Sequence, residues 1–283
     1  MKSKKNSGKK VFMNRRTYTL TIILAAIVIL LLVAGTGLLM PSEAYVTNFE
    51  NKNQPPSFLH LFGTDWMGRD MLARTIKGLS TSILIGVLAA GISSVIAVIL
   101  GTLSAVMGKK TDQVILWIID MVQGIPHLIL LMLISFMLGK GYQGVMVGIA
   151  VSHWPNLARI VRAEVMAVKN GQFVQASHKM GRSRMFIAMR HILPHVVPQY
   201  IVGLILLFPH AILHEASITF LGFGLSPEEP AVGIILSESM RYLTSGFWWL
   251  TVLPGAALLG IVLLFDAIGD NLRTIIDPYS AQE

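Results

Sequence analysis

The chain has 283 residues, of which 53% are hydrophobic and 13% are charged, and its formal net charge is +8. This composition excludes an ordinary soluble domain and is typical of a protein that crosses a membrane several times. The absence of cysteine excludes disulfides and thiol chemistry. The positive charges lie between long apolar runs, so they do not favour a nucleic-acid-binding function.

The first predicted element is an apolar run that follows a basic segment. Residues 1–17 carry seven lysines and arginines and no acidic residue, and residues 18–40 carry no charge. A run of about 20 apolar residues is long enough to cross a bilayer. No clear small-residue cleavage site is associated with it, so we expect an uncleaved first span preceded by a cytoplasmic segment. Residues 18–78 then comprise this span and an outer loop.

The outer loop contains a compact motif of glycine and charged residues. Residues 63–70 read Gly-Thr-Asp-Trp-Met-Gly-Arg-Asp, and prolines precede them at positions 41, 55 and 56. Glycine and proline at this density are typical of turns. The composition by itself therefore predicts a structured loop.

Residues 79–270 are predicted to form a core of five membrane helices. One of the apolar runs contains Asp120 and Pro126, and the next begins with Gly144 and Gly148, whose spacing allows close contact between helices. The apolar runs place these spans at about 79–107, 114–138, 144–160, 196–221 and 250–268.

One long polar and basic stretch, residues 171–195, interrupts this core. Its first part, residues 172–180, predicts a short helix with an apolar face. Gly181 breaks that helix, and Ser183 can cap a second short helix. We expect the second helix to end at Leu193-Pro194, because proline cannot donate a hydrogen bond inside a helix.

The distribution of charge predicts the orientation in the membrane. Of the 23 lysines and arginines, 17 lie in segments that a six-span topology places inside, and six lie outside. This bias obeys the positive-inside rule, with both termini cytoplasmic. A second outer loop, residues 222–247, ends beside a Phe-Trp-Trp cluster typical of a membrane interface. The inner segments are 1–17, 108–112, 159–195 and 271–283, the last being a cytoplasmic tail.

Two motifs resemble those of one family of transport proteins. Gln-Ala-Ser at residues 175–177, with Gly181 and Pro194 following at fixed distances, is similar to the EAA loop of permease subunits in binding-protein-dependent ABC importers. The motif at 63–70 resembles the Gly-Thr-Asp-x-x-Gly-Arg-Asp signature of the dipeptide, oligopeptide and nickel transporters within that family. The chain is therefore identified as a member of this family, and the resemblance covers nearly its whole length.

The resemblance implies an all-α polytopic membrane protein with six transmembrane helices and a cytoplasmic coupling helix pair between spans 4 and 5. It also implies a bacterial cytoplasmic (inner) membrane location, a homologous second permease subunit, two ATPase subunits that bind ATP and magnesium, and an extracytoplasmic substrate-binding protein. This chain itself would contact lipid, bind no cofactor and contact no nucleic acid. The residues implied in coupling to the ATPase are Gln175, Ala176, Ser177, Gly181, Arg182, Phe186 and Pro194.

The sequence departs from the family pattern at two positions of this loop. Gln175 stands for the usual glutamate, and Ser177 stands for the second alanine. The lost carboxylate weakens any argument that needs a charge there. The cargo also stays open, since short peptides, nickel and metal–chelator complexes all use permeases of this kind.

The sequence contains no recognisable catalytic or metal-binding motif. The Gly-Lys-Lys-Thr at 108–111 lacks the earlier glycine of an ATP-binding loop, and His214-Glu215 lacks the second histidine of a His-Glu-x-x-His site. We therefore expect no catalytic residue and no metal ligand in this chain. Energy would have to come from a partner subunit.

Three polar residues within spans are candidates for the transport pathway. Asp120 either lines the path or faces water at the cytoplasmic boundary, because a charge within a span usually faces a cavity. His210 and His214 are four residues apart and share one helix face. They either meet an anionic peptide end or a metal complex, or form hydrogen bonds within the helix bundle.

The alternative to a transport subunit is a self-contained channel, a membrane enzyme or a scaffold without an ATPase partner. An enzyme needs a catalytic constellation inside a span, and a channel needs a filter-like repeat. The sequence offers neither, and a scaffold leaves the two motifs unexplained.

Overall fold

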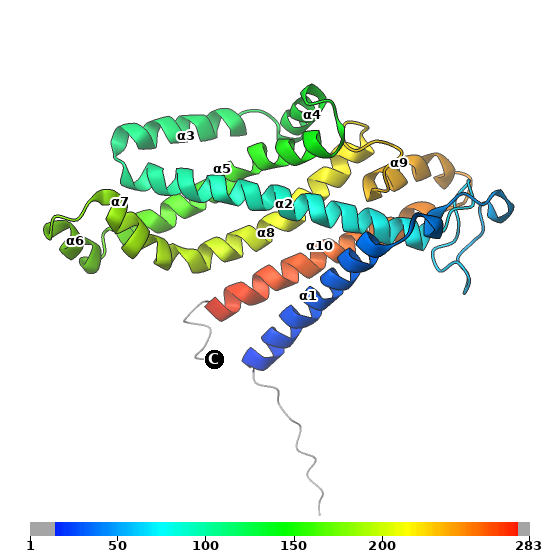
Figure 1. Ribbon diagram of the computed structural model, residues 1–283, viewed down its shortest axis with the longest axis horizontal. Helices are drawn as coiled ribbons and strands as arrows, with labels where there is room; N and C mark the ends of the chain where they lie inside the picture. Colours follow the sequence, from blue (N-terminus) through cyan, green and yellow to red (C-terminus); the bar gives the residue numbers. More distant parts are fainter. Residues whose placement is uncertain (1–14, 277–283) are drawn as a thin grey trace, which may run out of the picture.

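The computed structural model describes residues 15–276 as a bundle of helices (Figure 1). Predictions for residues 1–14 and 277–283 lie outside this range. Among the described residues, β-pairing is limited to one isolated bridge between Thr64 and Asp70. The α-helices are α1 (Arg15–Leu39), α2 (Met71–Val106), α3 (Lys109–Gln123), α4 (His127–Met137), α5 (Gly141–Lys169), α6 (Gln172–Lys179), α7 (Arg184–Ile187), α8 (Leu193–Phe220), α9 (Val232–Leu243) and α10 (Trp249–Ile276).

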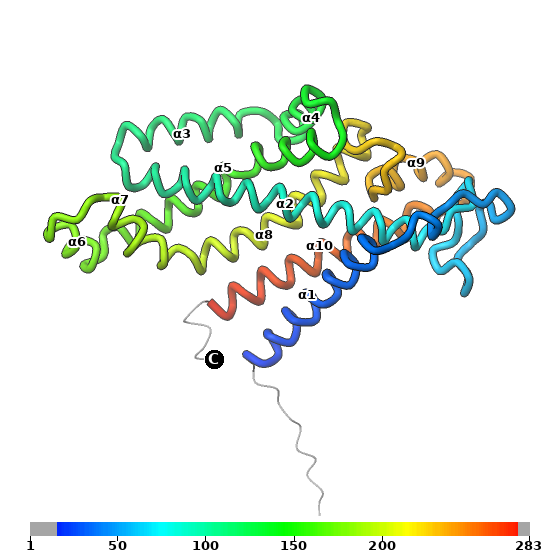
Figure 2. Tube along the Cα trace, viewed as in Figure 1, coloured from blue at the N-terminus to red at the C-terminus, as the bar shows by residue number. Residues whose placement is uncertain are grey.

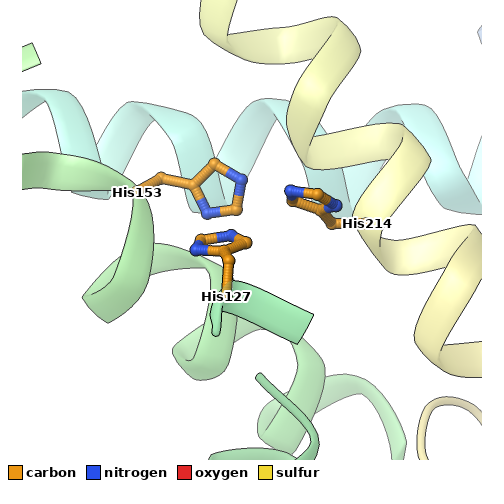
Figure 3. Close-up of side chains that lie close together, drawn as sticks. All are labelled: His127, His153 and His214. Carbon is orange, nitrogen blue, oxygen red and sulfur yellow. The ribbon is translucent and has the colours of Figure 1, made fainter. Parts of the chain in front are cut away.

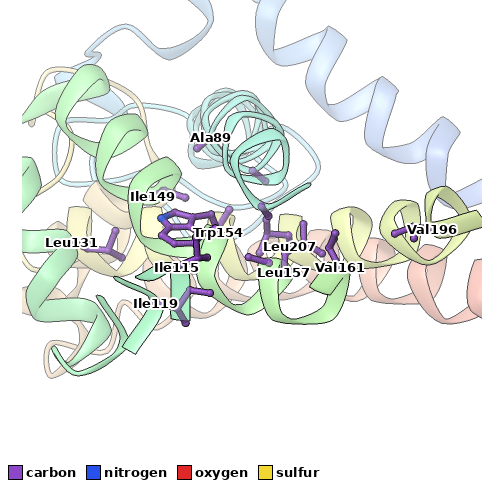
Figure 4. Packing of buried hydrophobic residues seen from close by; sticks show 14 of the residues in the cluster. Ala89, Ile115, Ile119, Leu131, Ile149, Trp154, Leu157, Val161, Val196 and Leu207 are labelled. Atoms are coloured by element: carbon purple, nitrogen blue, oxygen red, sulfur yellow. The ribbon is translucent and has the colours of Figure 1, made fainter. Parts of the chain in front are cut away.

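The centre of the bundle is the contact between α2 and α5. The buried residues of α2 are mostly alanine, glycine, serine and threonine, which let the two backbones approach closely. A Cβ at Gly101 of α2 would lie 2.6 Å from the carbonyl oxygen of Ala158 in α5. Larger side chains such as Trp154 and Leu207 fill the space where α5 meets α8 and α3 (Figure 4).

A second layer is formed by α1 and α10, which pack against each other and against α2. Ala26 and Leu30 of α1 join Ile261 and Phe265 of α10 in one buried cluster. The opposite side of α1 is apolar and exposed, with Leu31 67% exposed. An apolar surface of this kind suits contact with lipid, because the hydrocarbon core of a bilayer solvates it.

The described residues contain four helices that are long and apolar enough to cross a membrane, or up to five if one bent pair counts as a single span. These helices include α1, α2 and α10, and the α7–α8 run. The predicted fourth span lies within α5, which has 29 residues but carries several polar side chains in its second half. The all-helical membrane fold is thus confirmed, whereas the count of six spans stays a prediction.

The predicted third span, residues 114–138, is broken. Helices α3 and α4 meet at an angle of 88°. The bend lies at Gly124–Pro126, where Gly124 ends α3 and Pro126 precedes α4. Proline lacks an N–H group and disfavours helical geometry in the residue before it, so the helix cannot run straight through this point.

The prediction that Leu193-Pro194 ends the second short helix is wrong. Helix α7 continues through a π-helical turn, Ala188–Ile192, directly into α8. In this turn the Leu193 N–H bonds to the Ala188 carbonyl five residues back. Pro194 comes directly after this turn, and the altered hydrogen-bond pattern of the turn accommodates its missing N–H within a continuous helix. The helix that contains the fifth predicted span therefore begins earlier in the chain than expected.

The predicted outer loop 222–247 contains a helix. Helix α9 occupies its central part and buries Val232 and Ile235 against neighbouring helices. The tube in Figure 2 shows that α9 and the loop after α1 lie at one end of the molecule, whereas α6 and α7 lie at the other. The start of α1 and the end of α10 lie side by side, away from α9 (Figure 2).

Candidate functional site

The motif at residues 63–70 forms a charged network at the α9 end of the molecule. Asp65 is fully buried, and its carboxylate accepts hydrogen bonds from the backbone N–H groups of Met67 and Arg69. Its second oxygen lies 2.7 Å from the guanidinium groups of both Arg69 and Arg74. Arg74 also donates to Glu238 of α9, over 3.0 Å. The network therefore ties the motif to the start of α2 and to α9.

Asp70 and Gly68 of the motif stabilise the start of α2 and the turn before it. Asp70 caps α2 by accepting from the Ala73 N–H, and its other oxygen lies 2.8 Å from His60 Nδ1. Gly68 has a positive φ of 75°, and a Cβ there would collide with the Asn48 carbonyl. Arg74 and Glu238 lie outside the motif, and their part in the network was not foreseen from the sequence. The motif thus forms a rigid cap on the bundle.

The stretch 171–195 forms a helix, a turn and a second helix. Gly181, at a φ of +76°, follows Met180, the C-cap residue of α6. The Gly181 N–H bonds to the His178 carbonyl and the Arg182 N–H bonds to the Ser177 carbonyl, which together make a Schellman motif. Ser183 caps α7 by accepting from the Phe186 N–H over 3.2 Å. The predicted glycine turn and serine cap are both present.

The predicted coupling residues do not all face outward. Ser177 is buried against the bundle, 6% exposed, and the other six residues are exposed. Gln175 donates to the Asn170 carbonyl, and the Arg182 guanidinium lies over the Phe186 ring at 4.9 Å. The same stretch carries further exposed apolar side chains. They are Phe173, Met180, Met185 and Met189.

A cleft of about 620 Å³ opens between the α3–α4 bend, α5 and α8. Both predicted pathway histidines, His210 and His214, line it. Two histidines that sequence analysis did not single out, His127 and His153, line it as well. The imidazole rings of His127, His153 and His214 converge from α4, α5 and α8 (Figure 3). The cleft is therefore a histidine-rich cavity.

The three converging rings lie in direct contact. The centroid of the His127 ring lies 4.6 Å from that of His153 and 4.5 Å from that of His214, and the last two are 5.1 Å apart. Their possible ligand nitrogens all lie within 4.8 Å of one another. The structure thus brings together the residues of a potential metal site. A histidine inside an apolar run is itself a functional signal, and it was available at both missed positions.

Asp120 lies apart from this cleft. Its carboxylate forms an ion pair with Arg159 of α5, and both side chains are substantially exposed. Closer to the start of the same helix, the Asp112 carboxylate accepts two hydrogen bonds from Arg162, each 2.7 Å long. Asp120 therefore belongs to a set of charge pairs that fasten α3 to α5.

Comparison with solved structures shows the fold. The chain superposes on inward-facing conformations of the MetNI methionine ABC transporter with a TM-score of 0.61, at 21% identity, over 73% of this chain and 98% of that one. It also superposes on an amino acid ABC transporter crystallised with histidines, with a TM-score of 0.55 and 19% identity over 75% of this chain and 95% of that one.

Comparison with known sequences shows the family. Relatives include the dipeptide permease DppC of Bacillus subtilis, 32% identical over 85% of this chain and 75% of its own length. The oligopeptide permease OppC of Bacillus subtilis is 34% identical over 82% of this chain and 76% of its own length. Residues 83–279 match the binding-protein-dependent transport system inner membrane component. The chain belongs to this family and is a permease subunit of an ABC importer of the peptide transport group.

Proposed function

We propose that the chain forms one half of the translocation path of an ATP-driven importer. A homologous permease forms the other half, and an extracytoplasmic binding protein delivers peptides, nickel or metal-chelate complexes. Two partner ATPase subunits bind ATP and magnesium, and this chain is not an enzyme. In this proposal α5 completes six spans, and both termini lie in the cytoplasm of a bacterial cell.

The observation that carries this proposal is the exposed apolar surface of the stretch 171–195. Met180 is 74% exposed, and Phe173 is 44% exposed. The same stretch carries the exposed Lys179, Arg182, Arg184 and Arg190, which distinguishes it from the uncharged apolar side of α1. A surface that combines exposed apolar side chains with arginine is typical of a protein–protein interface. We propose that this surface docks on an ATPase subunit.

A charge placed on this surface tests the proposal. Met180→Asp should sharply lower the amount of ATPase that co-purifies with the permease, because a carboxylate would be buried at an apolar contact. Met240→Asp, in the exposed part of α9 at the opposite end, is the matched control and should leave co-purification unchanged. Equal ATPase recovery with both variants would contradict docking at this surface.

The orientation has its own test, which the absence of native cysteine makes clean. Ser183 and Ser57 are both exposed, near α7 and in the loop after α1. Ser183→Cys should react in intact cells only with reagents that cross the membrane, and Ser57→Cys should react with impermeant reagents. Labelling of Ser183→Cys by an impermeant reagent would reverse the proposed orientation.

A further inference from the structure

Three histidines from three helices meet in the cleft, with their rings turned toward one another (Figure 3). His153 is 5% exposed, and His127 and His214 are partly buried. We propose that these three imidazoles bind a divalent transition-metal ion that enters the cleft as part of a small anionic chelate. This inference rests on the proposed function, because it treats the metal complex as cargo.

The hydrogen bonds of His153 prepare it to act as a ligand. Its Nδ1 lies 3.0 Å from the Ile149 carbonyl oxygen, which can only accept, so Nδ1 carries the proton. The lone pair of the neutral ring is therefore on Nε2. That atom is buried and has no hydrogen-bond partner. A backbone carbonyl that orients one ring nitrogen while the other faces a metal is the usual arrangement around metal-bound histidine.

The other two rings complete a site that needs little movement. His127 Nε2 is also buried without a hydrogen-bond partner. The ligand nitrogens of the three residues lie within 4.8 Å of one another. Metal–nitrogen bonds of about 2.0–2.1 Å require each nitrogen to move inward by less than about 1 Å. His127 directly follows the bend at Pro126, and a small rotation of α4 supplies such a movement.

The ligand type selects the metal. Neutral imidazole suits nickel, cobalt, copper and zinc, whereas magnesium and calcium prefer oxygen ligands. Three protein ligands leave at least one coordination position open. A site of this composition accepts a metal that keeps other ligands of its own, which is the form a chelate takes.

The charge of the cleft points to a chelate rather than a bare ion. Among the described residues that line the cleft there is no aspartate, glutamate, lysine or arginine. Glu215 follows His214 in the chain, but it is fully buried and accepts a hydrogen bond from Thr219. A bare dication would therefore be held without a counter-charge, which is costly inside a membrane. Carboxylates of the chelator supply that charge, and a cleft of about 620 Å³ is within the size range of small-molecule sites.

The same geometry disfavours the carboxylate end of a peptide as the ligand of these three residues. A carboxylate accepts hydrogen bonds and needs donors. The Nε2 atom of His153 is an acceptor in the tautomer that the Ile149 carbonyl selects. Two acceptors repel each other, whereas a metal cation attracts the lone pair.

The test is metal binding by the assembled permease pair and ATPase subunits, purified without a polyhistidine tag and without the binding protein. Radioactive Ni²⁺, supplied as its complex with a small carboxylate chelator such as citrate, measures affinity in equilibrium dialysis, and the visible absorption of Co²⁺ supplied in the same form reports the change in coordination. His127→Ala and His214→Ala should each weaken Ni²⁺ binding by at least about tenfold and remove the Co²⁺ band. His153→Ala should do the same, and the two partly buried positions keep the test valid if that variant does not fold.

His60→Ala is the matched control, because it removes an imidazole that lies outside the cleft beside the Asp70 carboxylate. It should change Ni²⁺ affinity by less than about twofold, far below the loss expected for a ligand. Unchanged Ni²⁺ binding in His127→Ala and His214→Ala would overturn the inference. A different pair of results would assign the cleft to peptide instead. The unaltered complex would bind no Ni²⁺, and both variants would lower dipeptide transport to the same extent.

The two proposals fail in distinguishable ways. If the ATPase does not co-purify with the unaltered permease, the proposed function fails, and Ni²⁺ binding can still be measured on the full chain. If the ATPase co-purifies and the histidine variants bind Ni²⁺ normally, the metal site fails and the importer stands.

Discussion

A side chain at Gly181 tests the turn between α6 and α7 without introducing a clash. Gly181 has a φ of +76°, and a Cβ built there meets no atom within 4 Å. The cost of Gly181→Ala is therefore backbone strain, roughly 1–2 kcal/mol. Val is branched at Cβ and should cost more. A strain of about 1–2 kcal/mol changes an equilibrium by a factor of roughly 5–30.

This strain can be relieved by opening the turn. Doing so breaks the bonds from the Gly181 and Arg182 N–H groups to α6, each worth about 0.5–1.5 kcal/mol. The first short helix then tilts relative to the second, while the long helices keep their contacts. We expect Gly181→Val to accumulate in the membrane but to lose most ATPase binding, transport and cargo-stimulated ATP hydrolysis. Gly181→Ala should show a milder form of the same defect.

Gly246 provides the control for this experiment. It has a φ of +88°, its Cβ position is equally open, and it lies between α9 and α10 at the opposite end of the molecule. Gly246→Val should carry the same strain and leave ATPase binding intact. Normal transport by Gly181→Val would refute the coupling role of the turn, and failure of that protein to accumulate would assign the glycine to folding.

Two further predictions concern stability, measured by thermal unfolding of the purified permease in detergent. Gly101→Ala should destabilise the protein by about 1–3 kcal/mol, because the added Cβ would press on the Ala158 carbonyl. Gly91→Ala, on the same helix with open space around it, should leave the stability unchanged. Equal losses of stability in the two variants would contradict the packing argument. Asp65→Asn should cost about 3–5 kcal/mol, since it leaves two arginines without their buried carboxylate. Glu50→Gln, an exposed acid in the same loop, should change stability little, and a comparable loss would show that burial of Asp65 is not the cause.

The helices predictable from the sequence were those with one dominant signal. The apolar runs that became α1 and α10 are long enough to span a membrane. Gly181 and Ser183 were also predictable, because a helix end needs a residue that tolerates positive φ and the next helix needs a capping oxygen. These features depend on residues close together in the chain.

The two prolines show why the remaining helices were harder to predict. Pro126 was placed inside a single predicted span and instead lies at an 88° bend between two helices. Pro194 was expected to end a helix and instead sits within a continuous one, since the π-turn before it shifts the hydrogen-bond pattern by one residue. A proline forbids one hydrogen bond, but the neighbouring helices decide whether the chain bends or adapts.

The histidine cluster escaped sequence analysis for a related reason. His210 and His214 were recognised because they are one helical turn apart. His127 and His153 lie on other helices, and only the α3–α4 bend and the packing of α5 bring them to His214. Spacing rules detect ligands on a single helix, and this cluster takes one residue from each of three.

The close contact of α2 with α5 has a mechanical consequence. Two helices that touch through backbone atoms at Gly101 and Ala158 have no long side chains that could change rotamer to absorb a displacement. They must therefore move as one rigid body, and any widening of the cleft has to come from α4 or α8. His153 lies on α5 and belongs to the rigid body, whereas His127 and His214 lie on α4 and α8, which can move relative to it. The distances from the His153 ring to the His127 and His214 rings therefore measure how far the cleft has opened.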